Sequence, residues 1–465
     1  MPAGATKPFA GRNSINEPTP STASTPPRAS LLARLLKSVA TIEPYEVKAV
    51  VLSMLYFFFL FASYSVVKPV RDAMGTIYGV AHYQELFTAT LLASLIFAPL
   101  YSGLAARIKL SVFLPWVYGF VALTMLGFYA LFIDYKDDDR WVAAGFFVWV
   151  STFNLLIISV FWTFMADIFS RTQAKRLFGF VAAGGTVGSI VGPALATFLA
   201  KALGSNRLIL ISAAGFIVTA VLVRVLAHEK QRLLSAGVEV QRTSLDHRLP
   251  GNPFDGFMLL LRSRYLLLLA LFLLLMTWIS TIVYFQLGDL ITRAYSSRDA
   301  RAHAYGVIEL SVNSLALVIQ LFGSGRLIAR FGVKAALLLN PIIMVIAFLA
   351  IAFSPLLLIL GGIQIVRRVA EYALAKPARE MLFTVVDQQS RYKAKNVIDT
   401  VVYRFGDFSN AWVSSLVQPH GVIGLAIFGV ITSALWFPIA WLLGRQYDSE
   451  RSGEPPGKDA GKFGS

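Results

Sequence analysis

Long apolar runs alternate with short polar stretches along most of this chain. Each run is about as long as a helix needs to cross the ~30 Å hydrocarbon core of a bilayer. The pattern predicts twelve transmembrane segments, at 47–67, 86–104, 112–133, 141–165, 177–200, 207–227, 265–289, 304–325, 335–353, 356–374, 396–418 and 421–444. We therefore expect an all-α membrane protein.

The longest polar stretch between these segments, residues 228–264, separates six of them from the other six. It predicts an N-terminal six-helix bundle at 41–227 and a C-terminal bundle at 265–446, joined by a cytoplasmic loop. Residues 1–40 and 447–465 are poor in long apolar runs, and we expect disordered cytoplasmic tails there. No signal-peptide pattern opens the sequence.

Composition supports the membrane prediction, since 56% of the 465 residues are hydrophobic, 15% are charged and the mean hydropathy is +0.64. Cysteine is absent, which excludes disulfides and thiolate metal sites. The net charge of +16 would suggest nucleic acid in a soluble protein, but membrane topology explains it better. With a cytoplasmic N-terminus, 29 of the 42 Lys and Arg residues fall in cytoplasmic segments and 9 in outer loops. We expect both termini in the cytoplasm.

One charged phrase occurs twice between apolar segments. "DIFSRTQAKR" at 167–176 and "DQQSRYKAKN" at 387–396 share the pattern Asp-x-x-Ser-Arg-x-x-Ala-Lys and lie 220 positions apart. A second pair, "LAAR" at 104–107 and "LIAR" at 327–330, lies 223 positions apart. Nearly equal offsets at equivalent loops indicate a duplicated six-helix unit with both copies in the same orientation.

This parallel repeat is the architecture of the major facilitator superfamily. "GRLIARFGVK" at 325–334 resembles the loop motif of that family, and "GLAARIKL" at 103–110 resembles a degraded copy. "GGTVGSIVGP" at 184–193 resembles its glycine-rich fifth helix. Glycines at intervals of four in a membrane helix predict a close approach to another helix.

Enzyme chemistry is not expected. The chain has no Gly-x-x-x-x-Gly-Lys-Ser/Thr loop for phosphates and no His-Glu-x-x-His metal motif, and its five histidines are scattered. We expect no catalytic residue, no metal site and no cofactor. A carrier is the default function for duplicated six-helix halves.

Charges inside the apolar segments are candidate functional residues, because each costs at least ~2.5–3.5 kcal/mol in a bilayer. Lys68, Arg71 and Asp72 stand at i, i+3 and i+4, which places them on one helical face. Pro69 predicts a kink in the same helix. The alternative is a cap or a snorkelling pair at the outer end of the helix.

Two later segments repeat this arrangement. Glu371 stands four residues after Arg367 and predicts an ion pair, which leaves Arg368 as an unpaired cation. Glu309 and Asn313 form a similar pair of positions on the eighth segment. Either structural ion pairs or residues of a transport cavity fit this pattern.

The eleventh segment gathers polar residues on one stripe, with a glycine in the stripe that predicts a break. The stripe holds Asp399, Tyr403, Arg404, Asp407 and Asn410, and the glycine is Gly406. Asn154, Trp162 and Asp167 follow one another along the fourth segment. Trp278 and Tyr284 have the spacing to stack on a ring of the substrate, although packing is the more common role of such aromatic residues.

The buried charges divide into three sets of candidates. The substrate-binding candidates are Lys68, Arg71, Arg367, Arg368 and Arg404. The candidates for coupling or charge pairing are Asp72, Glu309, Glu371, Asp399 and Asp407. The candidates for gating loops are Asp167, Arg171, Asp387 and Arg391. Five cations balance five carboxylates, so the arginines favour an anion as substrate while the carboxylates leave proton coupling open.

Taken together, four stretches resemble the bacterial and plastid ATP:ADP antiporter family of nucleotide exchangers. They are "VKPVRDAMG" (67–75), "FWTFMADIFSRTQAKRLFG" (161–179), "IQLFGSGRLIARFGV" (319–333) and "AREMLFTVVDQQSRYKAKNVIDTVVYRFGDFSNAW" (378–412). The resemblance implies ATP binding and exchange of ATP for ADP, or of nucleotides for phosphate. Arg71 and Asp72 match its first-helix pattern, whereas Asp407 stands where that family tends to have lysine, so Arg404 would have to substitute.

Two other functions stay open at this stage. One is a proton-coupled carrier for a drug, peptide or metabolite, in which Asp72, Glu309 or Asp399 would titrate. The other is a membrane scaffold or sensor that binds anionic lipid through the basic loop 228–264. For the carrier we expect a monomer in the bacterial inner membrane and no nucleic acid as partner. We expect a small anionic substrate, and the resemblance implies a nucleotide.

Overall fold

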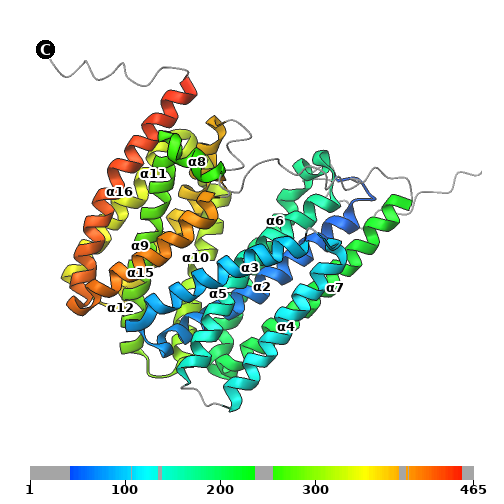
Figure 1. The fold of residues 1–465 in the computed structure, drawn as a ribbon, viewed down its shortest axis with the longest axis horizontal. Helices are drawn as coiled ribbons and strands as arrows, with labels where there is room; N and C mark the ends of the chain where they lie inside the picture. Colours follow the sequence, from blue (N-terminus) through cyan, green and yellow to red (C-terminus); the bar gives the residue numbers. More distant parts are fainter. Residues whose placement is uncertain are drawn as a thin grey trace, which may run out of the picture. The chain divides into compact units, whose positions relative to one another are not determined.

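The computed structural model describes residues 42–105, 107–134, 139–235, 255–386, 394–395 and 397–452 (Figure 1). Its regular elements in these ranges are helices, and no strand occurs among them. The prediction of an all-α protein is confirmed. The repeated phrase at 387–396 lies almost wholly outside the described residues, including Asp387 and Arg391.

The first half of the chain forms α2 (Val47–Tyr78), α3 (Tyr83–Ala105), α4 (Leu110–Asp134), α5 (Arg140–Ile168), α6 (Arg171–Leu203) and α7 (Ser205–Ser235). The second half forms α8 (Asp255–Arg262), α9 (Arg264–Ala294), α10 (Arg298–Phe322), α11 (Ser324–Phe353), α12 (Leu357–Ala370), α13 (Lys376–Leu382), α15 (Tyr403–Val417) and α16 (Gly421–Ser452). Two π-helical turns, Glu371–Ala375 and Val397–Val402, adjoin α12 and α15.

Eight helical spans of the described part are long and apolar enough to cross a membrane. The last of them, Val397–Glu450, contains two of the predicted segments. Each predicted segment falls on a helix of the structure, whereas a total of twelve crossings stays a prediction.

The helices extend beyond the apolar segments because polar caps, not the lipid-facing residues, mark their ends. Ser170 and Gln173 form a reciprocal capping box at the start of α6. The Ser297 side chain accepts from the Ala300 N–H, so α10 starts at Arg298, ahead of its apolar run. Helix α11 starts at Ser324, near the end of the predicted segment 304–325, and Gly332 interrupts it with φ +81°, a conformation that favours glycine.

Equivalent helices of the two halves pack in equivalent pairs (Figure 1). Helix α4 packs along α7, and α11 packs along α16. Helix α9 packs against α15 in the way that α2 packs against α6. Contacts between the halves join α3 to α15 and α6 to α10. This recurrence is what a duplicated unit predicts, while the bundle boundaries at 41–227 and 265–446 stay a prediction.

The glycines of α6 bring its backbone directly against α2. A Cβ atom at Gly184 would lie 2.1 Å from the Met54 carbonyl oxygen, and one at Gly188 would lie 2.4 Å from that of Phe58. At Gly192 it would lie 2.6 Å from the Cβ of Ser65. The predicted close approach of a glycine-rich helix is therefore confirmed, and α6 and α2 pack as one rigid pair.

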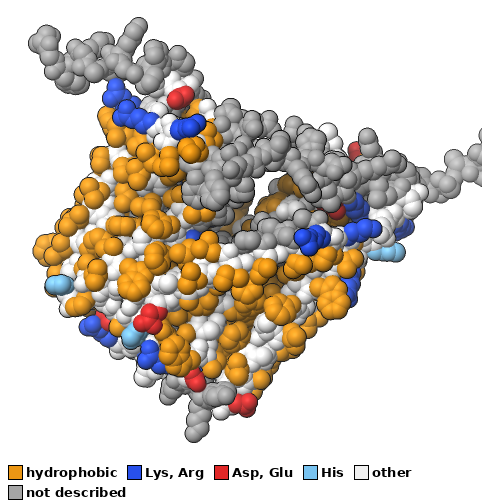
Figure 2. Space-filling model, in the orientation of Figure 1, with side chains coloured by type: hydrophobic (Ala, Val, Ile, Leu, Met, Phe, Trp, Pro, Cys, Tyr) orange, Lys and Arg blue, Asp and Glu red, His pale blue; other side chains and the backbone are white. Residues whose placement is uncertain are grey.

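Large apolar side chains point outward from the helices. Phe353 and Leu358 are 89% and 87% exposed, and Trp116 and Phe198 are each 72% exposed. Figure 2 shows hydrophobic side chains over most of the face in view, with charged side chains mainly toward the helix ends. Exposed apolar surface of this extent would aggregate in water, and a bilayer is the solvent that fits it.

Gly184→Ala should destabilise the protein strongly, because the new methyl group meets a backbone carbonyl that cannot move alone. We expect a fall of several degrees in the apparent Tm of the detergent-solubilised protein, measured by thermal unfolding. Gly179→Ala is the matched control in the same helix, since nothing lies within 4 Å of its added Cβ. Equal Tm values for both variants would contradict this account of α6.

Candidate functional site

The charged residues of α2 face inward and bind partners on several other helices. Helix α2 continues through Pro69. The Arg71 guanidinium donates to Asp72 Oδ1 at 2.5 and 3.0 Å, and Asp72 is only 3% exposed. Lys68 Nζ donates to Glu309 Oε2 of α10 at 2.9 Å. These contacts place the residues inside the protein, against the alternative of an exposed cap or a snorkelling pair.

Glu309 of α10 binds cations from both halves of the chain. Both of its carboxylate oxygens accept from the Arg368 guanidinium of α12, one of them at 3.1 Å, and Lys68 of α2 binds the same group. The side chain is 5% exposed. The prediction that Arg368 lacks a partner is wrong, because only residues of its own helix entered that prediction. Asn313 does not join the cluster through Glu309, since its Nδ2 donates to the Ser189 carbonyl oxygen of α6 at 2.7 Å.

Arg367 has different partners from Arg368. Its guanidinium donates to Glu371 Oε2 at 3.1 Å, to Gln364 Oε1 at 3.0 and 3.1 Å, and to Ser280 Oγ of α9 at 2.7 Å. The predicted pairing of Arg367 with Glu371 is confirmed. The two adjacent arginines thus hold two different carboxylates.

Arg404 is held by one hydrogen bond and one long ion pair. One of its terminal nitrogens donates to the Ser151 carbonyl oxygen of α5 at 3.0 Å, and the other lies 4.0 Å from Asp407 Oδ2. Its buried Nε has no hydrogen-bond partner in the described part of the chain. Asp407 also accepts from Thr281 Oγ1 of α9 at 3.4 Å. Arg404 therefore keeps donor capacity for another group.

Gly406 does not break the helix in this region. Helix α15 is continuous there, and a Cβ at Gly406 would lie 2.0 Å from Thr277 Oγ1 of α9. The glycine permits close packing of α9 and α15. Asn410 is fully buried, and its Oδ1 accepts from Ser414 Oγ at 2.8 Å.

Other candidates lie apart from this cluster. Asp399 is 3.5 Å from a terminal nitrogen of Arg379, and Asp167 pairs with Lys230 at 3.1 Å. Arg171 is the first residue of α6. The gating role of these loops stays a prediction.

Several polar contacts escaped sequence reasoning because one partner in each is uncharged. Tyr284 of α9, which the sequence offered only for ring stacking, donates from Oη to Asp72 Oδ1 at 3.0 Å, and Ser151 Oγ accepts from Arg71 at 3.4 Å. Tyr372 Oη accepts from Arg368 at 2.7 Å. A rare hydroxyl in an apolar run was the available signal, but it does not identify its partner. Trp278 donates from its indole N–H to Ser409 Oγ at 3.0 Å, and its stacking role stays a prediction.

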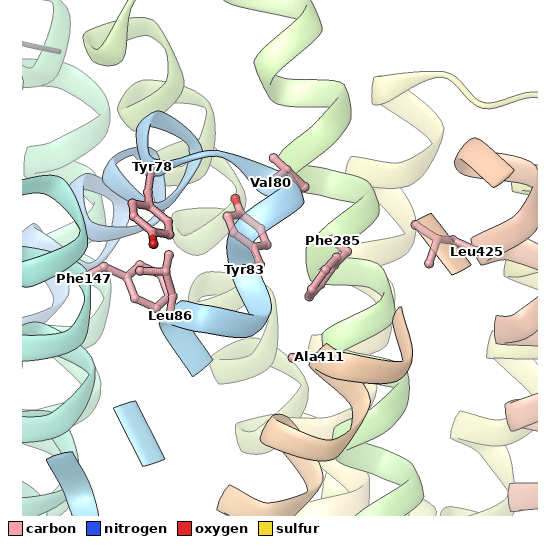
Figure 3. Packing of buried hydrophobic residues seen from close by; sticks show 8 residues of the cluster. All are labelled: Tyr78, Val80, Tyr83, Leu86, Phe147, Phe285, Ala411 and Leu425. Carbon is pink, nitrogen blue, oxygen red and sulfur yellow. The ribbon is translucent and has the colours of Figure 1, made fainter. Parts of the chain in front are cut away.

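An apolar cluster contains residues of both halves (Figure 3). Tyr284 packs against this cluster. Tyr83 packs against Tyr284 and Phe285, with ring centroids 5.3 and 5.2 Å apart. Leu86 and Ala411 belong to the same buried cluster, so α3, α9 and α15 all contribute. Nearby, the Trp412 indole donates to Thr88 Oγ1 at 3.0 Å, again between α15 and α3.

Cations outnumber carboxylates at this site. Lys68, Arg71, Arg367, Arg368 and Arg404 face Asp72, Glu309, Glu371 and Asp407, since Asp399 binds elsewhere. Such an excess of buried and half-buried positive charge attracts an anion, and planar guanidinium groups bind phosphate or carboxylate with two parallel bonds. Charged residues between two helical halves are the arrangement of a membrane transporter, and the class of this protein is a transporter and not an enzyme.

The chain belongs to the Major Facilitator Superfamily, whose family model matches residues 49–366. The resemblance to ATP:ADP antiporters is also confirmed. ADP,ATP carrier protein 1 of Chlamydia pneumoniae is 24% identical over 349 residues, which cover 66% of this chain and 68% of that protein. ADP,ATP carrier protein 1 of Chlamydia trachomatis is 23% identical over 329 residues, 64% of this chain and 62% of that protein.

Solved structures confirm the fold at low sequence identity. A bacterial homologue of the human lysosomal transporter Spinster has a TM-score of 0.60 at 14% identity, covering 88% of this chain and 99% of the other. A bacterial homologue of the iron transporter ferroportin has a TM-score of 0.58 at 14% identity, covering 85% and 98%. At this identity the likeness describes the fold alone.

Glu309→Gln should destabilise the protein, because it leaves Lys68 and Arg368 buried without their shared carboxylate. Removing one partner of a buried pair costs about 3–5 kcal/mol, which thermal unfolding in detergent would detect as a lower Tm. Asp289→Asn is the control, since Asp289 pairs with Arg293 at 2.7 Å in a contact whose side chains are 27% and 67% exposed. That control should cost at most ~1 kcal/mol. A Tm for Glu309→Gln as high as that of the control would contradict the assigned role of Glu309.

Proposed function

We propose that this protein is an antiporter of ATP/ADP-type nucleotides or related organic phosphates, working by alternating access. The observation that carries the proposal is the excess of buried and half-buried cations contributed by both halves. Lys68 and Arg71 come from α2, whereas Arg367, Arg368 and Arg404 come from α12 and α15. A phosphate group has enough charge and enough acceptor oxygens to bind several of them at once. The low-identity ADP,ATP carriers support the same substrate class.

Glu309 gives this site a mechanism for exchange. The Glu309 carboxylate accepts hydrogen bonds from Lys68 and Arg368, one from each half. A phosphate that takes over these two cations removes the ion pair between the halves, so binding and conformational change are coupled.

Obligate exchange follows from the cost of buried charge. When the cavity closes without a substrate, partly unpaired cations such as Arg404 enter a medium of low dielectric, which costs several kcal/mol per ion. A bound anion compensates these charges in either direction of transport. The empty carrier then returns slowly, and substrate on the opposite side accelerates uptake.

A proton-coupled carrier is the second candidate. It is favoured by Asp407, a half-buried carboxylate whose contact with Arg404 is 4.0 Å long and whose hydrogen bond to Thr281 is 3.4 Å long. A carboxylate held this loosely is a suitable proton acceptor. In that case uptake would follow the pH gradient and not the substrate inside the vesicle.

The proposed setting is a bacterial inner membrane with both termini in the cytoplasm, which rests on the distribution of Lys and Arg. A monomer suffices, because both halves of the site belong to one chain. Neither a nucleic acid nor a cofactor has a role in this proposal.

Uptake of labelled ATP into proteoliposomes should be stimulated at least severalfold by ADP inside. Arg404→Gln and Arg367→Gln should abolish this exchange, because each removes a buried donor for the anion while the protein still inserts. Arg293→Gln is the control, since Arg293 is an exposed cation outside the site. Uptake that ignores internal ADP but follows a pH gradient would refute exchange and favour the second candidate. Unchanged exchange in both site variants would refute the site.

A further inference from the structure

The helix that holds Arg367 and Arg368 contains a π-helical turn, Glu371–Ala375, just before Lys376. Pro377 explains the turn. Proline has no N–H, and its ring crowds the carbonyl group four residues earlier, which is that of Ala373. The Lys376 N–H accordingly binds the Glu371 carbonyl, five residues back. Pro377 cannot donate to the carbonyl groups of Tyr372 and Ala373, which lie five and four residues before it.

Two side chains from neighbouring helices supply the missing donors. Gln320 Nε2 of α10 donates to the Tyr372 carbonyl oxygen at 3.0 Å. Ser324 Oγ of α11 donates to the Ala373 carbonyl oxygen at 2.5 Å. The bond from Ser324 is buried, and a buried carbonyl without a partner would cost about 1–3 kcal/mol, so Ser324 stabilises the π-helical turn, whereas the bond from Gln320 is exposed and contributes less.

The turn changes which side chains share a face. In an uninterrupted α-helix, Lys376 would point ~80° away from Arg368, eight residues earlier. A π-helical turn is wider and rotates less per residue, which returns Lys376 to the side of Arg368. The two cations contact the same ring: the Arg368 guanidinium carbon lies 5.2 Å and Lys376 Nζ 4.9 Å from the Tyr372 centroid.

These contacts form a row of cations that leads from solvent to the centre of the site. Lys376 is exposed, Arg368 is buried, and Lys68 shares the Glu309 carboxylate with Arg368. We propose that Lys376 is a further anion-binding residue, which receives the phosphate group of the substrate ahead of Arg368. Gln320 and Ser324 are positioning residues that act on it through the π-helical turn. The inference rests on the proposed function and adds a residue to that site.

Pro377→Ala is the sharpest test, because it restores the missing N–H and lets a regular α-helix form. Replacing proline inside a helix normally stabilises it, so a purely structural role predicts a higher Tm and an unchanged KM. We expect instead a roughly tenfold higher KM for ATP and for inorganic phosphate in proteoliposome exchange, as for loss of one charge-assisted bond. Vmax should stay within about twofold. Pro438→Ala in α16 is the matched control and should leave KM unchanged.

Lys376→Gln should raise KM to the same extent, and combining it with Pro377→Ala should add little. Ser324→Ala should raise KM through the loosened turn, while Ser324→Thr keeps the hydroxyl and should restore it. An unchanged KM in Lys376→Gln or in Pro377→Ala, with normal exchange by the wild type, would overturn this inference alone. A wild-type protein that exchanges neither ATP nor phosphate would refute the proposed function, and the anion role of Lys376 with it.

Discussion

The Glu309 carboxylate is shared by Lys68 and Arg368, and the arrangement of the two halves depends on this contact. Three charged groups buried in a membrane protein are tolerated only where each has a partner of opposite charge. The three side chains come from α2, α10 and α12, so no single helix, and neither half, can satisfy them alone. In the proposed function, an anionic substrate competes for the same ion pairs that hold the halves together. Protein stability and affinity for the substrate would then be linked at one carboxylate.

Many of the contacts between the halves differ in kind from the glycine contacts within a half. Inside the first half, glycines such as Gly184 place the backbone of α6 directly on α2, and no small rearrangement relieves a clash there. Between the halves, many contacts are hydrogen bonds and ion pairs whose partners a ligand or water can replace. Tyr284 on Asp72 and Arg404 on the Ser151 carbonyl are of this second kind. This division is what alternating access requires of a protein built from rigid halves.

Sequence periodicity predicted the helices, the glycine contact and the pair of Arg367 with Glu371, because each of these depends on residues close together in the chain. The partner of Arg368 lies 59 positions away on another helix, and its identity depends on how the helices pack. The stripe on the eleventh segment was predicted as one face, yet the π-helical turn at Val397–Val402 precedes Tyr403 and Asp399 binds Arg379 instead. A periodicity of 3.6 contains no information about such a turn. Pro377 was the available signal for the other one.

The length of α2 has a mechanical consequence. It runs for 32 residues, or ~48 Å, as one continuous helix, and Lys68, Arg71 and Asp72 lie in its second half. A tilt of roughly 10° about the site would move the far end of such a rod by several ångströms. Because α6 is packed onto it without slack, that helix must follow. In the proposed function, a small tilt of α2 at the ion pair thus becomes a displacement of several ångströms at its far end, enough to admit solvent. The longer the helix, the larger this displacement.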